Sequence, residues 1–370
     1  MIDLFKVFMD PNVLEHLGPV LASGYVGEGL VSQNFEKKIG EFIKNPNVAV
    51  VNSGTSAITL ALRLAGVGPG TSVVTTPMTC LATNMPILSL GAHPIWADIL
   101  PDGNINPEDA YRKIRNDTRA ILCVDWGGMP CNLASLRVVA DYASIPLIED
   151  ACQSLGGTYR GTPIGNHADA VCFSFQAIKY LTTVDGGALV CNWNHGNLKR
   201  AKLLRWFGLD RTQSSMLRCG QDPPDWGYKF QTNDVLSSIG LANLASLADR
   251  LEIVRGNALQ YQEAFKDLQC VKTIPEGEDR QSAFWAYTLL VEDVESFVRF
   301  LRTKGVVASK IHDRNDTKTI FGASRQEALP GVDYFDRHHV CLPVGWWVGA
   351  PERHTIITAV KEWDTCEAGA

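Results

Sequence analysis

Short apolar runs recur along the first half of the chain, and polar positions rarely interrupt them. Runs of this kind, rich in Val and Ile and without alternation, are typical of strands buried on both faces of a mostly parallel sheet. Seven segments fit this description and are expected to form strands: Val48–Asn52, Ser72–Thr76, Pro94–Ala97, Ala120–Val124, Pro146–Ile148, Ala170–Phe173 and Ala188–Cys191.

Helical patterns lie between these runs. The clearest are Ser56–Leu64, Pro107–Ile114 and Leu133–Tyr142. Alternation of strands and helices predicts an α/β fold in which helices flank a mostly parallel sheet. In such folds, ligands bind beyond the carboxyl ends of the strands, so polar residues at those ends are the first candidates for a functional site.

The pattern changes after about Gly220. A loop rich in Pro, Gly and Asp precedes a long helical pattern from Val235 to Phe265. A strand-like segment, Ala283–Val291, and a helical segment, Val294–Lys304, come next. We therefore expect a large α/β domain over residues 1–245, with the N-terminal segment included, and a smaller α+β domain over residues 246–370.

The charge and hydropathy of the chain exclude two classes of partner. Its 34 Lys and Arg residues against 40 Asp and Glu residues give a formal net charge of −6, which argues against a nucleic-acid-binding protein. No run approaches the roughly 18 apolar residues of a membrane span. The first ten residues lack the basic start and apolar core of a signal peptide. We expect a cytoplasmic protein with no membrane partner.

The ten cysteines do not predict a metal centre. None belongs to a CxxC pair, and the pair His338-His339 has no second cluster of ligands near it in the sequence. Several cysteines lie within apolar runs, as Cys123 and Cys172 do. We interpret them as buried, reduced thiols and predict no metal.

Three strand ends carry residues that could do chemistry. The first run leads through Asn-Ser-Gly-Thr, residues 52–55, into a helix. A turn of this kind presents free backbone amides at a helix N-terminus, which favours a phosphate site at this turn. The alternative is a simple helix cap by Ser53 or Thr55, which is common at such positions.

The other two strand ends carry a carboxylate and an amine. Asp150 ends the run Pro146-Leu-Ile-Glu-Asp, and Lys179 lies just beyond the run that ends near Ser174. A buried carboxylate needs a partner, and a lysine in a dry pocket has a lowered pKa and can act as a nucleophile. The alternatives are a surface ion pair or cap for Asp150 and a solvent-exposed amine for Lys179.

Together the three features fit one cofactor, pyridoxal 5′-phosphate (PLP). PLP needs an anchored phosphate, an Asp against its pyridinium nitrogen and a Lys for its Schiff base. Asp150 and Lys179 are about one strand–loop–strand step apart, so both could reach one crevice. The sequence therefore predicts a PLP site.

The chain resembles the DegT/DnrJ/EryC1/StrS family of sugar aminotransferases over nearly its whole length. The motifs that carry the resemblance are NSGTSA (52–57), PMTCLATN (77–84), WGGMPC (126–131), EDACQSLGG (149–157), SFQAIKYLTTVDGG (174–187), GYKFQTND…IGLANL (227–244), HDRND (312–316) and LPVGWW (342–347). The resemblance implies the type I PLP-dependent transferase fold, a homodimer and aminotransferase activity.

The resemblance also implies roles for individual residues. Lys179 would form the Schiff base and move the proton, and Asp150 would keep the pyridine nitrogen protonated. Gln153 would contact the ring hydroxyl. The phosphate would be bound by Gly54, Thr55 and Ser174 and, across the dimer interface, by Lys229.

Three further positions follow from comparison with the family pattern. Cys80 stands where many relatives have an aromatic residue over the cofactor ring, and it would cover less of that ring. Tyr180 stands where Asn is common, and His312 lies near the family's substrate-side histidine. These two residues are the candidates for substrate contacts. Trp285, Trp346 and Trp347 are interpreted as core or interface aromatics rather than as sugar-stacking platforms.

The reaction that the resemblance implies is transfer of an amino group from an amino acid, glutamate or glutamine, to a keto group of a nucleotide-linked deoxysugar. Two other functions stay open. One keeps PLP and changes the chemistry, as a cyclitol (keto-inositol) aminotransferase or a sugar dehydratase. The other is a PLP-binding regulator without turnover, which the set Asp150, Gln153, Ser174 and Lys179 disfavours.

Overall fold

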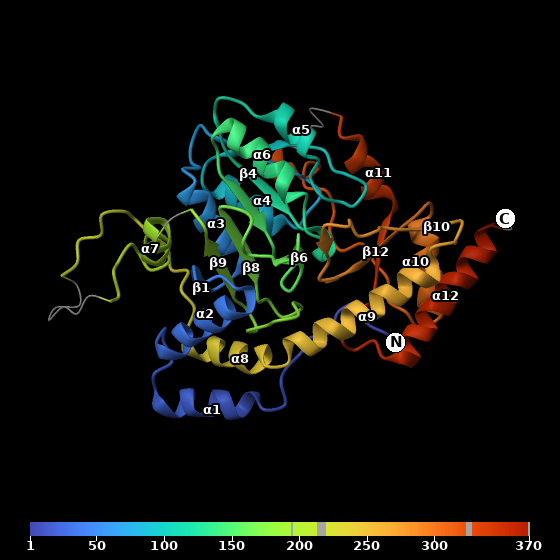
Figure 1. Ribbon diagram of the computed structural model, residues 1–370, viewed down its shortest axis with the longest axis horizontal. Helices are drawn as coiled ribbons and strands as arrows, with labels where there is room; N and C mark the ends of the chain where they lie inside the picture. The colour runs from blue at the N-terminus through green and yellow to red at the C-terminus, as the bar shows by residue number, and fades with distance from the viewer. Residues whose placement is uncertain (194, 213–219, 323–327, 369–370) are drawn as a thin grey trace.

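The computed structural model describes residues 1–193, 195–212, 220–322 and 328–368. A seven-stranded sheet lies at its centre, in the order β1-β9-β8-β5-β4-β2-β3 (Figure 1). These strands are β1 (Val48–Val51), β2 (Ser72–Thr75), β3 (His93–Trp96), β4 (Thr118–Val124), β5 (Leu147–Asp150), β8 (Ala170–Ser174) and β9 (Gly187–Cys191). All seven predicted strands are present, with bounds shifted by one or two residues.

The sheet is mostly parallel, as the sequence predicts. Strands β3, β2, β4, β5 and β8 run in one direction. Strand β9 runs antiparallel to both of its neighbours, β8 and β1. Since β1 and β8 are each antiparallel to β9, they are parallel to one another, and their carboxyl ends lie at the same edge of the sheet.

Helices cover both faces of this sheet, because alternate residues of each strand pack into different apolar clusters. One cluster joins the sheet to α3 (Gly54–Leu64), α4 (Leu81–Ser89) and α7 (His195–Leu204). The other joins it to α2 (Leu30–Ile43), α5 (Pro107–Lys113) and α6 (Leu133–Ala143). Strand β5 shows the division, since Leu147 lies in the α6 cluster and Ile148 in the α3 cluster.

Side-chain oxygens fix helix starts in this fold, as α3 and α2 show. Ser53 Oγ accepts a hydrogen bond of 3.0 Å from Ser56 N at the start of α3. Helix α2 is capped from elsewhere in the chain: Asp234, the first residue of α8 (Asp234–Leu244), accepts hydrogen bonds of 2.8 Å from Gly29 N and 2.9 Å from Ser32 N. An acidic cap at a helix N-terminus stabilises the orphan amides there and fixes α2 against α8.

The C-terminal part is built on a second, antiparallel sheet in the order β10-β12-β13. Its strands are β10 (Val271–Thr273), β12 (Tyr287–Val291) and β13 (His339–Leu342). The helices of this part are α9 (Leu247–Phe265), α10 (Val294–Thr303), α11 (Pro330–His338) and α12 (Ala350–Ala368). They lie together on the right of Figure 1. None of the helices among the described residues is long and apolar enough to cross a membrane.

Contacts cross the expected domain boundary at residues 245 and 246. Strand β11 (Arg280–Gln281) pairs with β6 (Thr158–Tyr159), which in turn pairs with β7 (Thr162–Pro163). The N-terminal segment, which we assigned to the large domain, also contacts the C-terminal part. Ile2 N donates to Gly305 O at 2.7 Å, and the ring of Phe5 stacks on Trp285 with centroids 4.7 Å apart. The division into two domains stays a prediction.

The predicted long helix from Val235 to Phe265 is two helices in the structure. Helix α8 ends at Leu244 and α9 begins at Leu247. The side chain of Arg250, in the first turn of α9, donates a hydrogen bond of 2.6 Å to the carbonyl oxygen of Asn243 and another to that of Tyr180. These hydrogen bonds from the Arg250 guanidinium leave no recognisable pattern in the sequence. No Gly or Pro marks the break either, so it could not be predicted.

Candidate active site

The three strand ends picked out by the sequence meet at one edge of the central sheet. Asp150 is the last residue of β5 and Ser174 is the last residue of β8, and these two strands are parallel neighbours. Gly54 follows β1, whose carboxyl end lies at the same edge. The predicted residues Gly54, Asp150 and Ser174 therefore lie at one edge of the central sheet, whose strands β1, β8 and β9 are labelled in Figure 1.

The Gly54 turn packs directly against the other two strand ends. A Cβ atom on Gly54 would lie 2.8 Å from Cys152 Sγ and 2.9 Å from Ser174 Cβ, so only glycine fits. Ser53 caps the helix by bonding to Ser56 N, as the alternative interpretation expected. That cap leaves the amides of Gly54 and Thr55 without a hydrogen bond to another described residue. Thr55 itself is exposed.

Asp150 is nearly buried, with 4% of its surface exposed, and is held by two donors. Thr83 Oγ1, from α4, donates to Asp150 Oδ2 at 2.7 Å. The amide of Cys152 donates to Asp150 Oδ1 at 3.1 Å. Two donors on one buried carboxyl group fix its direction. Asp150 is therefore not part of a surface ion pair, and its burial favours the interpretation in which it binds a group within the site.

Lys179 follows β8, and its amine lies over an aromatic ring. Nζ is 3.7 Å from the centroid of Trp285. Burial lowers the pKa of Lys179, and nearby acidic groups, those of Cys152, Asp150 and Cys80, oppose this shift only in part. A lowered pKa increases the share of neutral amine at pH 7, which is the nucleophilic form.

Gln153 and His312 form a short polar chain beside this lysine. Gln153 Oε1 accepts a hydrogen bond of 2.8 Å from Gly127 N, and Gln153 Nε2 lies 3.2 Å from His312 Nε2. Burial, followed by the charge of Lys179, lowers the pKa of His312 to about 3. His312 is therefore neutral at pH 7, and its Nε2 accepts from the Gln153 amide.

Cys80 lies at the start of α4 and is partly exposed. Its thiol is near enough to Lys179 to oppose the lowering of that residue's pKa. The side chain of Tyr180, in contrast, is 7% exposed, and its hydroxyl donates to Phe284 O at 2.5 Å. This burial and this bond support a packing role for Tyr180; the predicted substrate contact stays untested.

Lys229 lies beside the phosphate-binding turn expected in its own chain. Asn52 Nδ2 donates to Lys229 O at 3.3 Å, and Asn52 N donates to Phe230 O at 2.7 Å. The ammonium group of Lys229 lies 4.6 Å from the centroid of the Trp206 ring. The structure contains one chain, so the predicted reach of Lys229 into a partner subunit stays a prediction.

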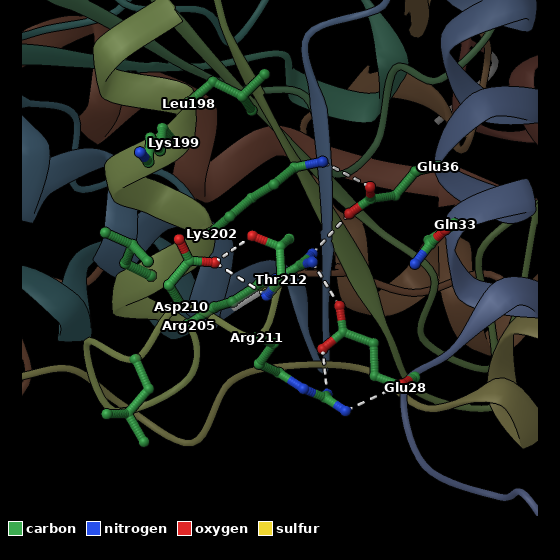
Figure 2. Close-up of a pocket in the computed structure, with 12 residues that line it drawn as sticks. Glu28, Gln33, Glu36, Leu198, Lys199, Lys202, Arg205, Asp210, Arg211 and Thr212 are labelled. Carbon is green, nitrogen blue, oxygen red and sulfur yellow. Dashed lines mark hydrogen bonds and ion pairs between the residues drawn. The ribbon is translucent and has the colours of Figure 1, made fainter. Parts of the chain in front are cut away.

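A large pocket elsewhere on the molecule contains none of these residues. It has a volume of about 690 Å³ and lies between the start of α2 and the segment that begins with α7. The Arg205 guanidinium forms ion pairs with Glu28 at 2.5 Å and with Glu36 at 2.6 Å. Lys202 pairs with Glu36 and Arg211 with Glu28, as Figure 2 shows. The carbonyl of Arg205 accepts from Phe230 N at 2.8 Å, so this ion-pair network supports the turn that carries Lys229.

Two site residues carried no assigned role in the sequence. Thr83 lies within the motif PMTCLATN, but nothing in the sequence shows that it bonds to Asp150. Trp285 was interpreted as a core aromatic; it is 3% exposed, which agrees, yet its ring also contacts the amine of Lys179. Trp285 is far from Lys179 in the sequence, so this contact could not be predicted from the sequence and is seen only in the folded chain.

Comparisons with known proteins now identify the family. The model of the DegT/DnrJ/EryC1/StrS aminotransferase family matches residues 9–361. The chain belongs to this family. It is an aminotransferase, as the sequence motifs indicated, and family membership implies PLP as the cofactor.

Three relatives illustrate the likeness. The chain is 30% identical over 290 residues to the spore coat polysaccharide biosynthesis protein SpsC of Bacillus subtilis, covering 77% of this chain and 74% of SpsC. It is 32% identical over 286 residues to the UDP-4-amino-4,6-dideoxy-N-acetyl-beta-L-altrosamine transaminase of Campylobacter jejuni, covering 76% and 74%. The crystal structure of the sugar aminotransferase CalS13 from Micromonospora echinospora superposes with a TM-score of 0.94 at 37% identity, covering 98% and 100%. The predicted type I transferase fold is confirmed by this likeness.

Proposed function

We propose that this aminotransferase moves an amino group from an amino acid, with glutamate as the expected donor, to a keto group of a nucleotide-linked deoxysugar, with PLP as its cofactor. The convergence of Lys179, Asp150 and the Gly54 turn at one sheet edge carries this proposal. An amine, an acid and a set of phosphate donors at one place match the three functional groups of PLP.

The residues present fit PLP. The missing Cβ of Gly54 lets the turn pack against Ser174, so a hydroxyl and two amides that have no hydrogen bond to another described residue lie together as donors for a phosphate. Asp150, fixed by Thr83 and Cys152, supplies the acid for the pyridine nitrogen. Lys179 supplies an amine with a lowered pKa.

When bound, PLP supplies an aldehyde that condenses with amines and a ring that withdraws electrons from the attached carbon. The chain's own residues would do the rest. Lys179 Nζ would take and return a proton as a general base and acid, which its lowered pKa favours. Trp285, stacked on Phe5, excludes water from one side of that amine. Gln153, held by Gly127, presents its amide to the site.

The substrate class rests on the relatives. The name of the Campylobacter jejuni relative describes a transaminase of a UDP-linked amino sugar, and the name of SpsC places that protein in polysaccharide biosynthesis. We therefore propose a nucleotide-linked keto-sugar as the acceptor. We also propose that two copies of the chain form a homodimer in which Lys229 reaches the partner's phosphate site, and that the enzyme works in the cytoplasm.

An assay of amino transfer tests this function. Purified enzyme, PLP and glutamate are mixed with a nucleotide-linked keto-sugar or with keto-inositol, and the aminated product is measured. We expect transfer to the keto-sugar, no turnover by Lys179→Ala, and normal turnover by Lys37→Ala, whose side chain is 74% exposed on α2.

Each other outcome would replace the proposal. Normal turnover by Lys179→Ala would remove Lys179 from the chemistry. Transfer to keto-inositol alone would make the enzyme a cyclitol aminotransferase, and loss of water from the sugar without amino transfer would make it a dehydratase. Bound PLP with no turnover for any donor would leave a PLP-binding regulator.

A further inference from the structure

Two carboxyl groups lie buried on the face of the sheet opposite to Asp150. Side chains alternate along β5, so Glu149 points to the α6 side while Asp150 points to the α3 and α4 side. Asp125 follows β4, next to β5, and its amide donates to Asp150 O at 3.2 Å. Glu149 and Asp125 are each 0% exposed. The proposed reaction uses neither of them.

The surroundings of these two groups differ sharply. Asp125 is well satisfied, because Ser154 Oγ donates to Oδ2 at 2.6 Å and Cys131 N donates to Oδ1 at 2.9 Å. Neither oxygen of Glu149 has a donor among the described residues. An ionised carboxylate buried without a donor is strongly unfavourable. Glu149 therefore needs either a donor or a proton of its own.

A proton on Glu149 solves this problem, because its neighbour is an acceptor. Asp125 follows β4, the strand that pairs with β5, and it is close enough to Glu149 for its charge to raise the pKa of Glu149. If both were ionised, two like charges would face each other in a dry interior, and if Glu149 is protonated it becomes a donor to Asp125. Burial, then the charge of Asp125, raises the pKa of Glu149 well above its ordinary value.

We infer that Glu149 is protonated and donates a hydrogen bond to the Asp125 carboxylate, and that this acid pair positions Gln153 in the active site. The first half of this inference is independent of the proposed function, and the second half rests on it. Glu149 is a positioning residue, since it faces away from the edge where Asp150 and Lys179 meet.

The path from the acid pair to Gln153 is short. Asp125 binds Ser154, the neighbour of Gln153 in the chain. The carbonyl of Asp125 accepts from Gly128 N at 3.2 Å, and Gly127 N holds Gln153 Oε1 at 2.8 Å. Asp125 thus contacts both segments that position the Gln153 side chain: its carboxylate binds Ser154, and its backbone carbonyl binds Gly128. Losing the Glu149 proton would put a second charge beside this carboxylate and loosen its contact with Ser154.

The sign of the pH dependence follows from the groups around Glu149. The ionisable groups that raise its pKa are the carboxyls of Asp125 and Asp150 and the thiol of Cys123. A pKa raised on folding means that the folded state binds more protons than the unfolded state above the ordinary Glu value. This group's contribution to stability is therefore present at low pH and declines as the pH rises above that value.

Infrared spectroscopy of the full-length protein tests the proton directly. At neutral pH we expect the carbonyl-stretching band of a protonated carboxylic acid, shifted in heavy water, in wild type and not in Glu149→Gln. Absence of the band from wild type would overturn the inference. Loss of the band in Asp125→Asn, with its persistence in Glu149→Gln, would assign the proton to Asp125 and overturn it as well.

A double-mutant cycle on PLP affinity tests the positioning role. Gln at position 149 keeps a donor for Asp125, so Glu149→Gln should bind PLP within about twofold of wild type, whereas Glu149→Leu should weaken binding roughly tenfold. Gln153→Ala should also weaken binding, and Glu149→Leu should add little to it. Multiplication of the two losses would show that Glu149 does not act through Gln153.

The controls separate this inference from the proposed function. A wild-type protein that binds no PLP would contradict the proposed function, whereas the infrared band would still decide where the proton lies. If Glu149→Leu does not fold, Glu149→Gln in the Gln153→Ala background replaces it: that pair should match Gln153→Ala alone, and a further loss of affinity would overturn the positioning role.

Discussion

At the scale of single residues, burial lowers the pKa of two basic side chains of this site, Lys179 and His312. Lys179 lies 3.7 Å from the Trp285 ring centroid, and the ring of His312 lies 6.2 Å from it, nearly parallel. Burial is the main cause that lowers the pKa of each, and for His312 the charge of Lys179 adds to the shift. His312 is therefore neutral at pH 7, and the share of neutral amine at Lys179 is increased.

The low pKa of His312 makes the stability of the protein depend on pH in a defined window. Between about pH 3 and pH 6.5 the unfolded chain binds a proton at this residue and the folded chain does not. Acidification through this window should lower the free energy of unfolding of wild type by up to a few kcal/mol because of this residue. The variant His312→Asn should lack this contribution to the pH dependence of stability. Urea unfolding at several pH values measures it.

His16→Asn provides the matched control, because His16 is exposed on α1 (Val13–Ser23). That variant should keep the wild-type slope. A slope for His312→Asn that runs parallel to wild type between pH 3 and 6.5 would show that His312 is not held neutral in the folded protein.

How far residues could be predicted depended on where their partners lie. Asp150 and Lys179 end or follow apolar runs, so their place at a sheet edge could be inferred from the sequence alone. Thr83 and Trp285 reach these two residues from other elements, and no local pattern marks such contacts. Tyr180 was predicted from its place after the lysine, yet its hydroxyl bonds to the backbone of Phe284.

At the scale of elements, glycines show where helices pack too closely for a side chain. In α8, a Cβ on Gly240 would lie 2.6 Å from Phe35 Cζ and 2.7 Å from Thr183 Cγ2. In α9, a Cβ on Gly256 would meet nothing within 4 Å. The same substitution should therefore have opposite effects in two consecutive helices.

Gly240→Ala should destabilise the protein by about 1–3 kcal/mol, because Phe35 and Thr183 would have to move. Gly256→Ala should stabilise it by about 0.5–1 kcal/mol, because alanine has the higher helix propensity and the site is open. Urea unfolding of both variants measures the two effects. Equal changes in the free energy of unfolding would contradict the packing of α8 against Phe35.

The order of the elements was largely predictable, and their directions were less so. Buried runs of Val and Ile predicted the strands, but nothing in the run Ala188–Cys191 indicates that β9 is antiparallel to its neighbours. The helical pattern from Val235 to Phe265 was continuous in the sequence. The break at residues 245 and 246 coincides with Arg250 binding the carbonyl oxygens of Asn243 and Tyr180, contacts that exist only in the folded chain.

At the scale of the whole molecule, the site depends on segments that are distant in the sequence. Phe5 from the N-terminal segment stacks on Trp285 from the C-terminal part, and Trp285 contacts Lys179 from the central sheet. The N-terminal segment thus helps to enclose the amine of Lys179. The segment is held in place by backbone hydrogen bonds between Ile2 and the C-terminal residues Gly305 and Val307. Such long-range contacts could not be predicted from hydrophobic patterns, which report only on neighbours within one element.

The central claim is that Lys179 is the amine that bonds covalently to PLP. The most direct measurement is borohydride reduction of the purified protein after incubation with PLP, followed by peptide mapping with mass spectrometry. We expect a pyridoxyl group on the peptide that contains Lys179. A pyridoxyl group on another lysine instead, or no covalent label in protein saturated with PLP, would contradict it.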